Sequence, residues 1–258
     1  MSDTWERVQL ASASVPFRVK TAAVWVVLFL LLGFVGNAAG FDLQWIRDNF
    51  RYILGGLRYT MFIAVCGIVL AVVLALLGAL ARISRNPVAY GVAGFYVSFF
   101  RGTPLLLQVL LIYLGLPQLG LVLSAIPAGM IALSLCYGAY MAEIFRAGIQ
   151  GIPRGQWDGA SSLGLSPGQT MRLVILPQAV RLIIPPTGNQ FIAMLKDSSL
   201  VSVMGVWELM YLARNYGRAE FKYMEMLITA AVIYWLLSAV FELVQARLER
   251  RFGRGVSV

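Results

Sequence analysis

The chain contains 258 residues, of which 59% are hydrophobic and only 13% are charged, and its mean hydropathy is +0.77. Soluble domains are about 45–50% apolar, so this composition indicates a membrane protein, and the long apolar runs predict spanning helices. The net charge is +9. The arginines cluster at the ends of apolar runs, which favours an anionic membrane surface over nucleic acid as their partner. The sequence contains neither histidine nor a P-loop motif, which excludes histidine-based catalysis and P-loop ATP binding by this chain.

The two cysteines, Cys66 and Cys136, lie in separate apolar runs. Small buried thiols are common in such runs, whereas a metal site or a disulfide requires ligands or partners at a suitable spacing. We therefore expect neither a disulfide nor a metal site.

The N-terminal region combines a polar segment, residues 1–20, with an apolar run, residues 21–39. A basic start, an apolar middle and the small residues Asn37-Ala38-Ala39 are also typical of a signal peptide. The apolar run 21–39 is longer than the apolar region of a typical signal peptide. We interpret it as an additional, uncleaved transmembrane helix that follows a cytoplasmic N-terminal segment.

The rest of the chain alternates apolar runs with basic or aromatic boundaries. Residues 40–56 form an amphipathic segment typical of a membrane interface. The predicted fold is an all-α polytopic membrane protein with about six transmembrane helices and both termini in the cytoplasm. The expected spans are 21–39, 57–81, 104–117, 124–147, 173–195 and 226–244.

The helix expected to begin at Asn86-Pro87 is interrupted by Arg101-Gly102-Thr103-Pro104. Thr103 suits an N-cap and Pro104 a first helical position, so this break predicts the start of a new span. In one interpretation the break only ends one helix and starts the next. In the other, the break faces a cavity, where a helix N-terminus would favour a carboxylate such as that of an amino acid.

The span at 173–195 contains Pro177 and the pair Pro185-Pro186, which remove backbone donors. A break in a membrane helix is tolerated where protein covers it or where it lines a wet cavity. Asn189, just beyond the prolines, therefore either bonds freed carbonyls or lies on a substrate path. Ser198 follows the span and is a further polar candidate.

Two charged pairs lie near the ends of spans. Glu143 and Arg146 are three residues apart, so they face each other on a helix, and we expect a structural pair rather than a substrate contact. Lys196-Asp197 ends the span at 173–195, where we expect an ion pair at the outer membrane boundary.

The segment 150–170 is the only long polar stretch in the centre of the chain. Pro153 suits a first helical position, and Gly164 can adopt the left-handed conformation that ends a helix. Ser166 and Gln169 have the spacing of a reciprocal capping box. These features predict a helix, a glycine corner and a second helix, although a merely well-capped loop between two spans has the same local signals.

This segment resembles the cytoplasmic EAA loop of permease subunits of ATP-binding-cassette (ABC) importers. The loop's core corresponds to Asp158-Gly159-Ala160, three residues and Gly164, with Asp in place of Glu and Gly in place of the first Ala. The resemblance covers about residues 50–250 and is closest to the polar amino-acid branch. The other matching motifs are 99–105 (FFRGTPL), 138–140 (GAY) with Glu143, 175–179 (ILPQA), Pro185-Pro186 with Asn189, and 196–200 (KDSSL).

The resemblance implies the permease subunit of an ATP-driven importer of polar amino acids in the bacterial inner membrane. It implies a second permease subunit, two ATPase subunits that hold ATP and magnesium, and an extracytoplasmic binding protein, with no cofactor and no catalysis on this chain. The transport domain would be 50–250, and it would contain the coupling loop 150–170. Four residues of this loop are predicted to couple the chain to the ATPase, and three residues elsewhere are candidates for the substrate path. The coupling residues are Gly155, Asp158, Ala160 and Gly164, and the substrate-path residues are Thr103, Asn189 and Ser198.

Two other functions remain open from the residues alone. A secondary transporter of a small polar solute would run on an ion gradient and would need no ATPase, although no strong inverted repeat supports this. A membrane enzyme would require clustered catalytic groups, whereas the carboxylates here are scattered and histidine is missing.

Overall fold

The computed structural model describes residues 16–38 and 40–252, in which every regular element is a helix or helical turn. Contacts divide the chain into two units, Met1–Arg47 and Asp48–Val258. Most of the predicted cytoplasmic segment 1–20 lies outside the described residues, as do Ala39 and the last six residues of the basic tail.

The first unit is built around helix α2, Phe17–Ala38, which begins four residues before the predicted start of the first span. The apolar side chains described on this helix are exposed, as expected for a helix whose partner is lipid. Helix α3, Leu43–Leu54, confirms the predicted amphipathic helix, and the division between the units falls within it. The Asp42 carboxylate accepts a hydrogen bond from the Trp45 amide at 2.9 Å, which satisfies one donor at the start of α3.

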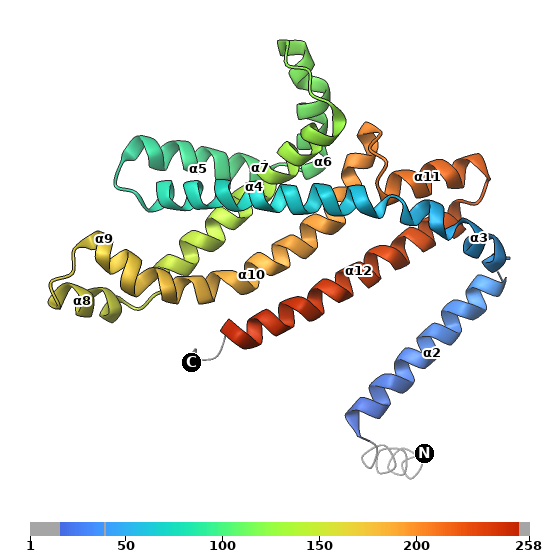
Figure 1. The fold of residues 1–258 in the computed structure, drawn as a ribbon, viewed down its shortest axis with the longest axis horizontal. Helices are drawn as coiled ribbons and strands as arrows, with labels where there is room; N and C mark the ends of the chain where they lie inside the picture. The colour runs from blue at the N-terminus through green and yellow to red at the C-terminus, as the bar shows by residue number, and fades with distance from the viewer. Residues whose placement is uncertain (1–15, 39, 253–258) are drawn as a thin grey trace, which may run out of the picture. The chain divides into compact units, whose positions relative to one another are not determined.

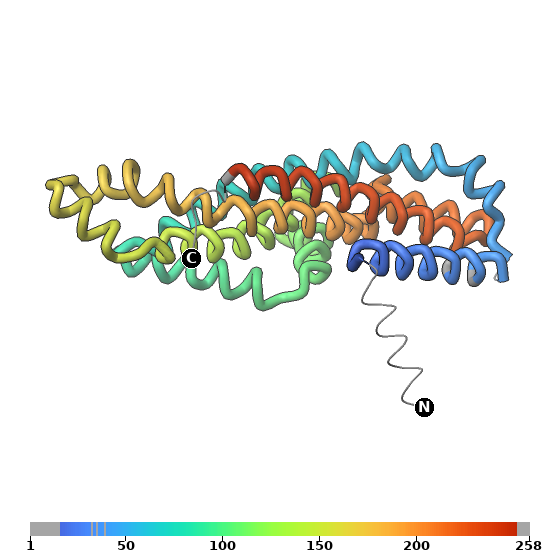
Figure 2. Tube along the Cα trace, turned by 90° about the horizontal axis from the view of Figure 1, so that it is seen from below, coloured from blue at the N-terminus to red at the C-terminus, as the bar shows by residue number. Residues whose placement is uncertain are grey.

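The second unit contains all the remaining helices. Figures 1 and 2 show α8 and α9 at one end of this unit and α11 at the other, with α4, α10 and α12 running lengthwise between them. The elements are α4 (Leu57–Ile83), α5 (Pro87–Gly102), α6 (Leu105–Leu110), η1 (Leu111–Gly115), η2 (Leu116–Leu119), α7 (Ala125–Gln150), α8 (Arg154–Ser162), α9 (Pro167–Gln169), η3 (Thr170–Ile175), α10 (Leu176–Asp197), η4 (Ser198–Met204), α11 (Leu209–Ala219) and α12 (Tyr223–Phe252).

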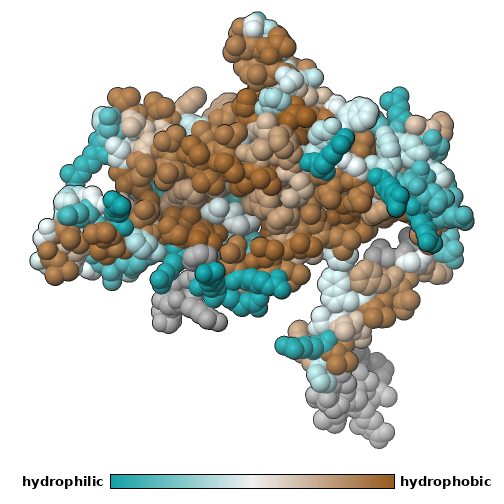
Figure 3. Space-filling model, viewed as in Figure 1, coloured by the Kyte–Doolittle hydropathy of each residue, from teal (hydrophilic) through white to brown (hydrophobic). Residues whose placement is uncertain are grey.

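Four helical segments of the described residues are long and apolar enough to cross a membrane, and a fifth is the bent pair of α5 and α6. The four are Phe17–Ala38, Leu43–Ile83, Ala125–Gln150 and Tyr223–Arg251. The remaining predicted span, 173–195, corresponds to α10, which is 22 residues long but less apolar than α4 and α7 because it contains prolines and polar side chains. In Figure 3 apolar side chains cover much of the middle of the second unit, and hydrophilic ones gather at its two ends and around the C-terminal end of α12.

Small side chains bring α4 and α7 together along their length. The buried face of α4 includes Ala71, Ala75 and Ala79, and α7 presents Ala128 and Ala132 to the same core. Lipid is as apolar as leucine, so close backbone approach through small residues is the main source of packing energy between membrane helices. The α4–α7 pair is therefore the rigid frame on which the other helices are positioned.

The break between α5 and α6 is a sharp bend of 109°. Asn86 caps α5 as predicted, because its side-chain oxygen accepts hydrogen bonds from the amides of Val88 and Ala89. Pro104, and not Thr103, occupies the N-cap position of α6. The Thr103 hydroxyl instead donates to the carbonyl of Phe99 at 2.9 Å, so it satisfies the end of α5 rather than the start of α6.

The Glu143–Arg146 pair forms as predicted, with a nitrogen–oxygen distance of 2.7 Å. The same carboxylate also lies 3.5 Å from the guanidinium of Arg82 on α4. This carboxylate therefore joins two helices near the end of α7 that leads into α8, which supports a structural role.

Candidate functional site

The α8–α9 corner is ordered by its own backbone. Gly164 has φ +75°, the left-handed conformation predicted for it. Its amide donates to the carbonyl of Ser161 at 2.9 Å, and the amide of Leu165 donates to that of Ala160 at 3.2 Å. These two bonds form a Schellman motif, which satisfies carbonyls left free at the end of α8. A side chain at Gly164 would strain the corner because left-handed backbone disfavours a Cβ atom.

The start of α9 carries the capping box predicted from the sequence. The Ser166 hydroxyl accepts from the Gln169 amide at 3.4 Å, and the Gln169 side chain accepts from the Ser166 amide at 2.9 Å. The prediction for Pro153 was off by one position, since α8 begins at Arg154 and Pro153 precedes it as the N-cap residue. Both sides of the glycine are therefore fixed by bonds within a few residues.

The four predicted coupling residues all lie on this corner, but they face different ways. Gly155, Asp158 and Gly164 are exposed, whereas Ala160 is buried against the rest of the chain. Asp158 is the fifth residue of α8, so it does not cap that helix, and its carboxylate makes no hydrogen bond or ion pair with the residues described. An unpaired carboxylate between two exposed glycines is a surface open to another protein.

The corner is attached to α10 on its inner face. The side-chain amide of Gln178 donates to the side-chain oxygen of Gln156 at 3.0 Å, which links α10 to α8. Trp157 packs against the hydrophobic core, and Ala160 on the same face is only 4% exposed. Helix α8 is therefore attached to α10 and to the core by both a hydrogen bond and packing.

Helix α10 is continuous from Leu176 to Asp197, so the predicted interruption at Pro185-Pro186 is wrong. The helix accommodates the two prolines internally, and the Thr187 hydroxyl donates to the carbonyl of Ile183 at 2.8 Å within this region. The π-helical segment η3, Thr170–Ile175, precedes Pro177 and joins α9 to α10. Neighbouring helices and side-chain hydroxyls stabilise such prolines in membrane helices.

A cavity of about 300 Å³, with several polar side chains in its lining, lies where α10 ends, beside the bend between α5 and α6. Asp197 is the only charged residue in its lining, and the hydroxyl of Tyr137 donates to the Asp197 carboxylate at 2.7 Å. No basic side chain lines it. The full lining is Thr103, Pro104, Leu105, Cys136, Tyr137, Tyr140, Gln190 and Asp197. A pocket with one carboxylate, phenol and amide groups suits a small polar molecule with a cationic group.

Of the three predicted substrate-path residues, only Thr103 lines this cavity. Asn189 instead accepts a hydrogen bond from Gln245 of α12 at 2.9 Å, and Ser198 is fully buried, with its hydroxyl donating to the carbonyl of Leu195. The expected Lys196–Asp197 ion pair is also not observed among the described residues, since Asp197 bonds to Tyr137.

Gln190 and Asp197 were not predicted as substrate-path residues, although they are the neighbours of Asn189 and Ser198. They are seven residues apart in the C-terminal part of α10 and lie on one face of the helix, about 10 Å apart along its axis. That spacing was the signal available in the sequence.

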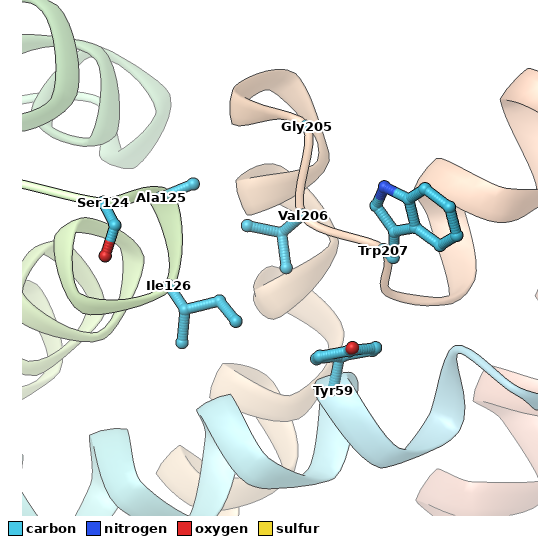
Figure 4. Close-up of a pocket in the computed structure, with 7 residues that line it drawn as sticks. All are labelled: Tyr59, Ser124, Ala125, Ile126, Gly205, Val206 and Trp207. Atoms are coloured by element: carbon cyan, nitrogen blue, oxygen red, sulfur yellow. The ribbon is translucent and has the colours of Figure 1, made fainter.

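A second, more open cavity of about 490 Å³ lies at the end of the unit opposite α8. Figure 4 shows Tyr59 below it, with Ile126 and Val206 on one side and Trp207 on the other. The cavity is mainly apolar, and its lining carries no charged residue. It lacks the carboxylate that distinguishes the cavity at Asp197.

Comparisons with known proteins agree with this geometry. The family described as "Binding-protein-dependent transport system inner membrane component" matches residues 67–254. A probable amino-acid ABC transporter permease protein, YckA of Bacillus subtilis (strain 168), is 39% identical over 209 residues, which cover 81% of this chain and 92% of the relative. The L-cystine transport system permease protein TcyB of the same organism is 40% identical over 225 residues, which cover 86% and 95%.

The solved structures include the same fold. In the structure titled "Crystal structure of an amino acid ABC transporter with histidines", a chain 38% identical in sequence matches with a TM-score of 0.78. The match covers 81% of this chain and 98% of that one. The apolar helices, the capped corner and these relatives together show that the chain belongs to the binding-protein-dependent transport family, as a multi-pass permease subunit of an amino-acid ABC importer in which ATP hydrolysis takes place on a separate chain.

Proposed function

We propose that the α8–α9 corner receives a force from a separate ATPase subunit and passes it through α10 to the cavity at Asp197. The observation that carries this proposal is the corner itself, which is fixed by a Schellman motif on one side of Gly164 and a capping box on the other. A rigid corner transmits displacement, whereas a flexible loop would absorb it.

The outer face of the corner supports a docking role. A Cβ atom at Gly155, Gly159 or Gly168 would meet nothing within 4 Å in this chain. Glycine inside a helix costs about 1 kcal/mol relative to alanine, so Gly155 and Gly159 weaken α8 without any packing benefit within the chain. Close approach by another protein accounts for them, and Asp158 between them offers that protein a carboxylate.

The complete transporter would contain two permease subunits, identical or homologous, two ATPase subunits with ATP and magnesium, and an extracytoplasmic binding protein. In the bacterial inner membrane the α8–α9 corner would face the cytoplasm. Arg82, Arg85, Arg154, Arg172 and Arg247 lie on the side of the spans that this orientation places inside, as the positive-inside rule requires.

The cavity at Asp197 is the proposed binding position for the substrate on its path. Every free α-amino acid carries an ammonium group, and Asp197 is the charge that would bind it. Tyr137 holds the carboxylate in position, while Gln190 and Thr103 offer further polar contacts. Because Gln190 and Asp197 lie on the helix that contacts α8, movement of the corner would change the shape of this cavity.

The coupling proposal is tested by Gly164→Leu in the complex reconstituted with its ATPase subunits and binding protein. We expect normal insertion in the membrane but loss of uptake per ATP hydrolysed, because a left-handed residue with a side chain costs about 1–2 kcal/mol and deforms the corner. The matched control is Gly120→Leu, which places the same strain at another left-handed glycine, φ +82°, outside the corner. Normal transport by the Gly164 variant would overturn the proposal.

The substrate proposal is tested by Asp197→Asn in the same system, with uptake measured for a panel of radiolabelled amino acids. We expect the half-saturating concentration to rise about tenfold or more, because a charge-assisted hydrogen bond becomes a neutral one. Basal ATP hydrolysis serves as the measure of assembly. An unchanged affinity for every transported amino acid would remove Asp197 from the path.

A further inference from the structure

Helix α12 is hydrogen-bonded to the proline region of α10 through the side-chain amide of Gln245. Its nitrogen donates to the carbonyl of Pro185 at 3.2 Å and to the side-chain oxygen of Asn189 at 2.9 Å. It also lies 2.8 Å from the carboxylate of Glu249, one turn further along α12. The amide therefore has acceptors both on α10 and on its own helix.

A glycine on α10 gives the Gln245 side chain room. A Cβ atom at Gly188 would lie 3.1 Å from the Cδ atom of Gln245, so the Gln245 side chain would have to shift. Phe191 and Phe241 pack edge to face, with ring centroids 4.9 Å apart, so the two helices also touch beside the amide. Small residues and polar side chains are the usual means by which membrane helices are held together.

The nitrogen of the Gln245 side-chain amide faces more acceptors than it has hydrogens, and its oxygen lacks a donor. One –NH₂ group has two hydrogens, yet it faces three acceptors. The side-chain oxygen of Gln245 is buried and has no hydrogen-bond partner among the described residues. A purely structural contact would normally satisfy such a group, and an unsatisfied one in a native protein requires an explanation.

The position of the contact along α10 supplies that explanation. Gln178, near the start of α10, bonds to the corner helix α8, and Asp197, at its end, lines the polar cavity. Pro185 and Asn189 lie between them. Any movement that passes from the corner to the cavity along α10 therefore passes the point where Gln245 holds the helix.

We propose that Gln245 is a positioning residue that pins the proline region of α10 to α12 in one state of the transporter and releases it in another. On release, the amide keeps its bond to Glu249, so α10 moves without leaving a donor unsatisfied. A second acceptor on the same helix makes the contact reversible, whereas a buried donor left without a hydrogen-bond partner would be costly. This inference rests on the proposed coupling function and assigns Asn189 to the pin rather than to the substrate path.

The test is Gln245→Leu, which removes the amide and keeps a side chain of similar length, in the complex reconstituted with its ATPase subunits and binding protein. We expect amino-acid uptake per ATP hydrolysed to fall about 3- to 30-fold, the usual range for residues that couple two sites. Complex assembly and the concentration of amino acid that gives half-maximal uptake should not change, because Gln245 is outside the cavity lining.

The second arm is a double-mutant cycle. Asn189→Ala alone should lower uptake per ATP hydrolysed. The Asn189→Ala, Gln245→Leu double variant should lower it no further than Gln245→Leu does, because both substitutions remove the same hydrogen bond. The matched control is Glu242→Gln, an exposed side chain one turn earlier on α12 that should leave the ratio unchanged. Additive losses, or an unchanged ratio in Gln245→Leu, would overturn the inference.

The wild-type complex separates the two proposals. If it shows no uptake driven by ATP, the coupling function itself fails. If it transports normally and Gln245→Leu keeps the wild-type ratio, only the pin fails. A fall in assembly without a change in the ratio assigns Gln245 a merely structural role and also overturns the inference.

Discussion

Two corners of this permease are built from the same parts and behave differently. The α8–α9 corner turns at Gly164, with φ +75°, and the corner before α11 turns at Gly205, with φ +81°. Each is followed by a helix whose N-cap side chain accepts backbone hydrogen bonds, Ser166 in the first and Glu208 in the second. The first remains exposed, whereas Glu208 is fully buried.

The two corners differ in how far apart in sequence their hydrogen-bonded residues lie. The bonds that fix the turn at Gly164 and the start of α9 join residues no more than five apart. At the second corner the hydroxyl of Tyr234 donates to Glu208 at 2.6 Å, and the amide of Leu209 donates to the hydroxyl of Thr60 at 3.3 Å. A locally fixed corner keeps its outer face free for a partner, while a corner fixed by distant helices is part of the core.

The largest expected effect is that of Glu208→Ala. It removes the cap from the amides of Met210 and Tyr211 and leaves the Tyr234 hydroxyl buried without its acceptor. These losses together should destabilise the fold by about 2–4 kcal/mol, measured by denaturant titration in detergent micelles. The control is Glu220→Ala, an exposed carboxylate at the other end of α11, which should change stability by less than about 0.5 kcal/mol. Equal effects of the two variants would contradict the comparison.

The next largest expected effect is a dependence of folding stability on pH, which only the buried corner at Glu208 should show. Burial raises the pKa of Glu208 above its ordinary value, although its hydrogen bonds oppose this. The folded state therefore holds the proton more tightly than the unfolded state, and the associated stability is present below about pH 4.3 and is lost as the pH rises through the folded-state pKa.

Glu208→Gln cannot ionise at this position, so the stability of the wild type relative to this variant should fall as the pH rises, by up to about 1.4 kcal/mol per pH unit. Unfolding of both proteins in micelles from pH 4 to pH 7.5 measures the difference. A difference that is constant over this range would show that burial does not dominate at Glu208.

The smallest effect is expected for Ser166→Ala at the exposed corner. Loss of one half of the capping box should cost about 1 kcal/mol, and nothing buried is left unsatisfied. Ser162→Ala is the matched control, because its hydroxyl bonds within α8 and caps nothing. A cost for Ser166→Ala as large as that for Glu208→Ala would show that the α8–α9 corner is held by more than local bonds.

Contacts predicted from the sequence and contacts seen only in the structure divide in the same way as the two corners. Gly164, the Ser166 capping box and the Asn86 cap were predicted from the sequence because each depends on bonds a few residues long. The surroundings of Asn189, which bonds to α12, and of Ser198, which is fully buried, were not predicted. Their environments are set by helices far along the chain, which a local pattern does not contain.

The sequence by itself determined the membrane class, the all-helical fold, the transporter family and the shape of the exposed corner, because apolar runs, caps and left-handed glycines act over one or two turns. Only the tertiary structure decided that α10 is continuous through Pro185-Pro186, that Asp197 and Tyr137 share a cavity, and that Gln245 reaches across to α10. The physical reason is that packing between helices selects which polar side chains meet, and this selection depends on residues separated by tens of positions.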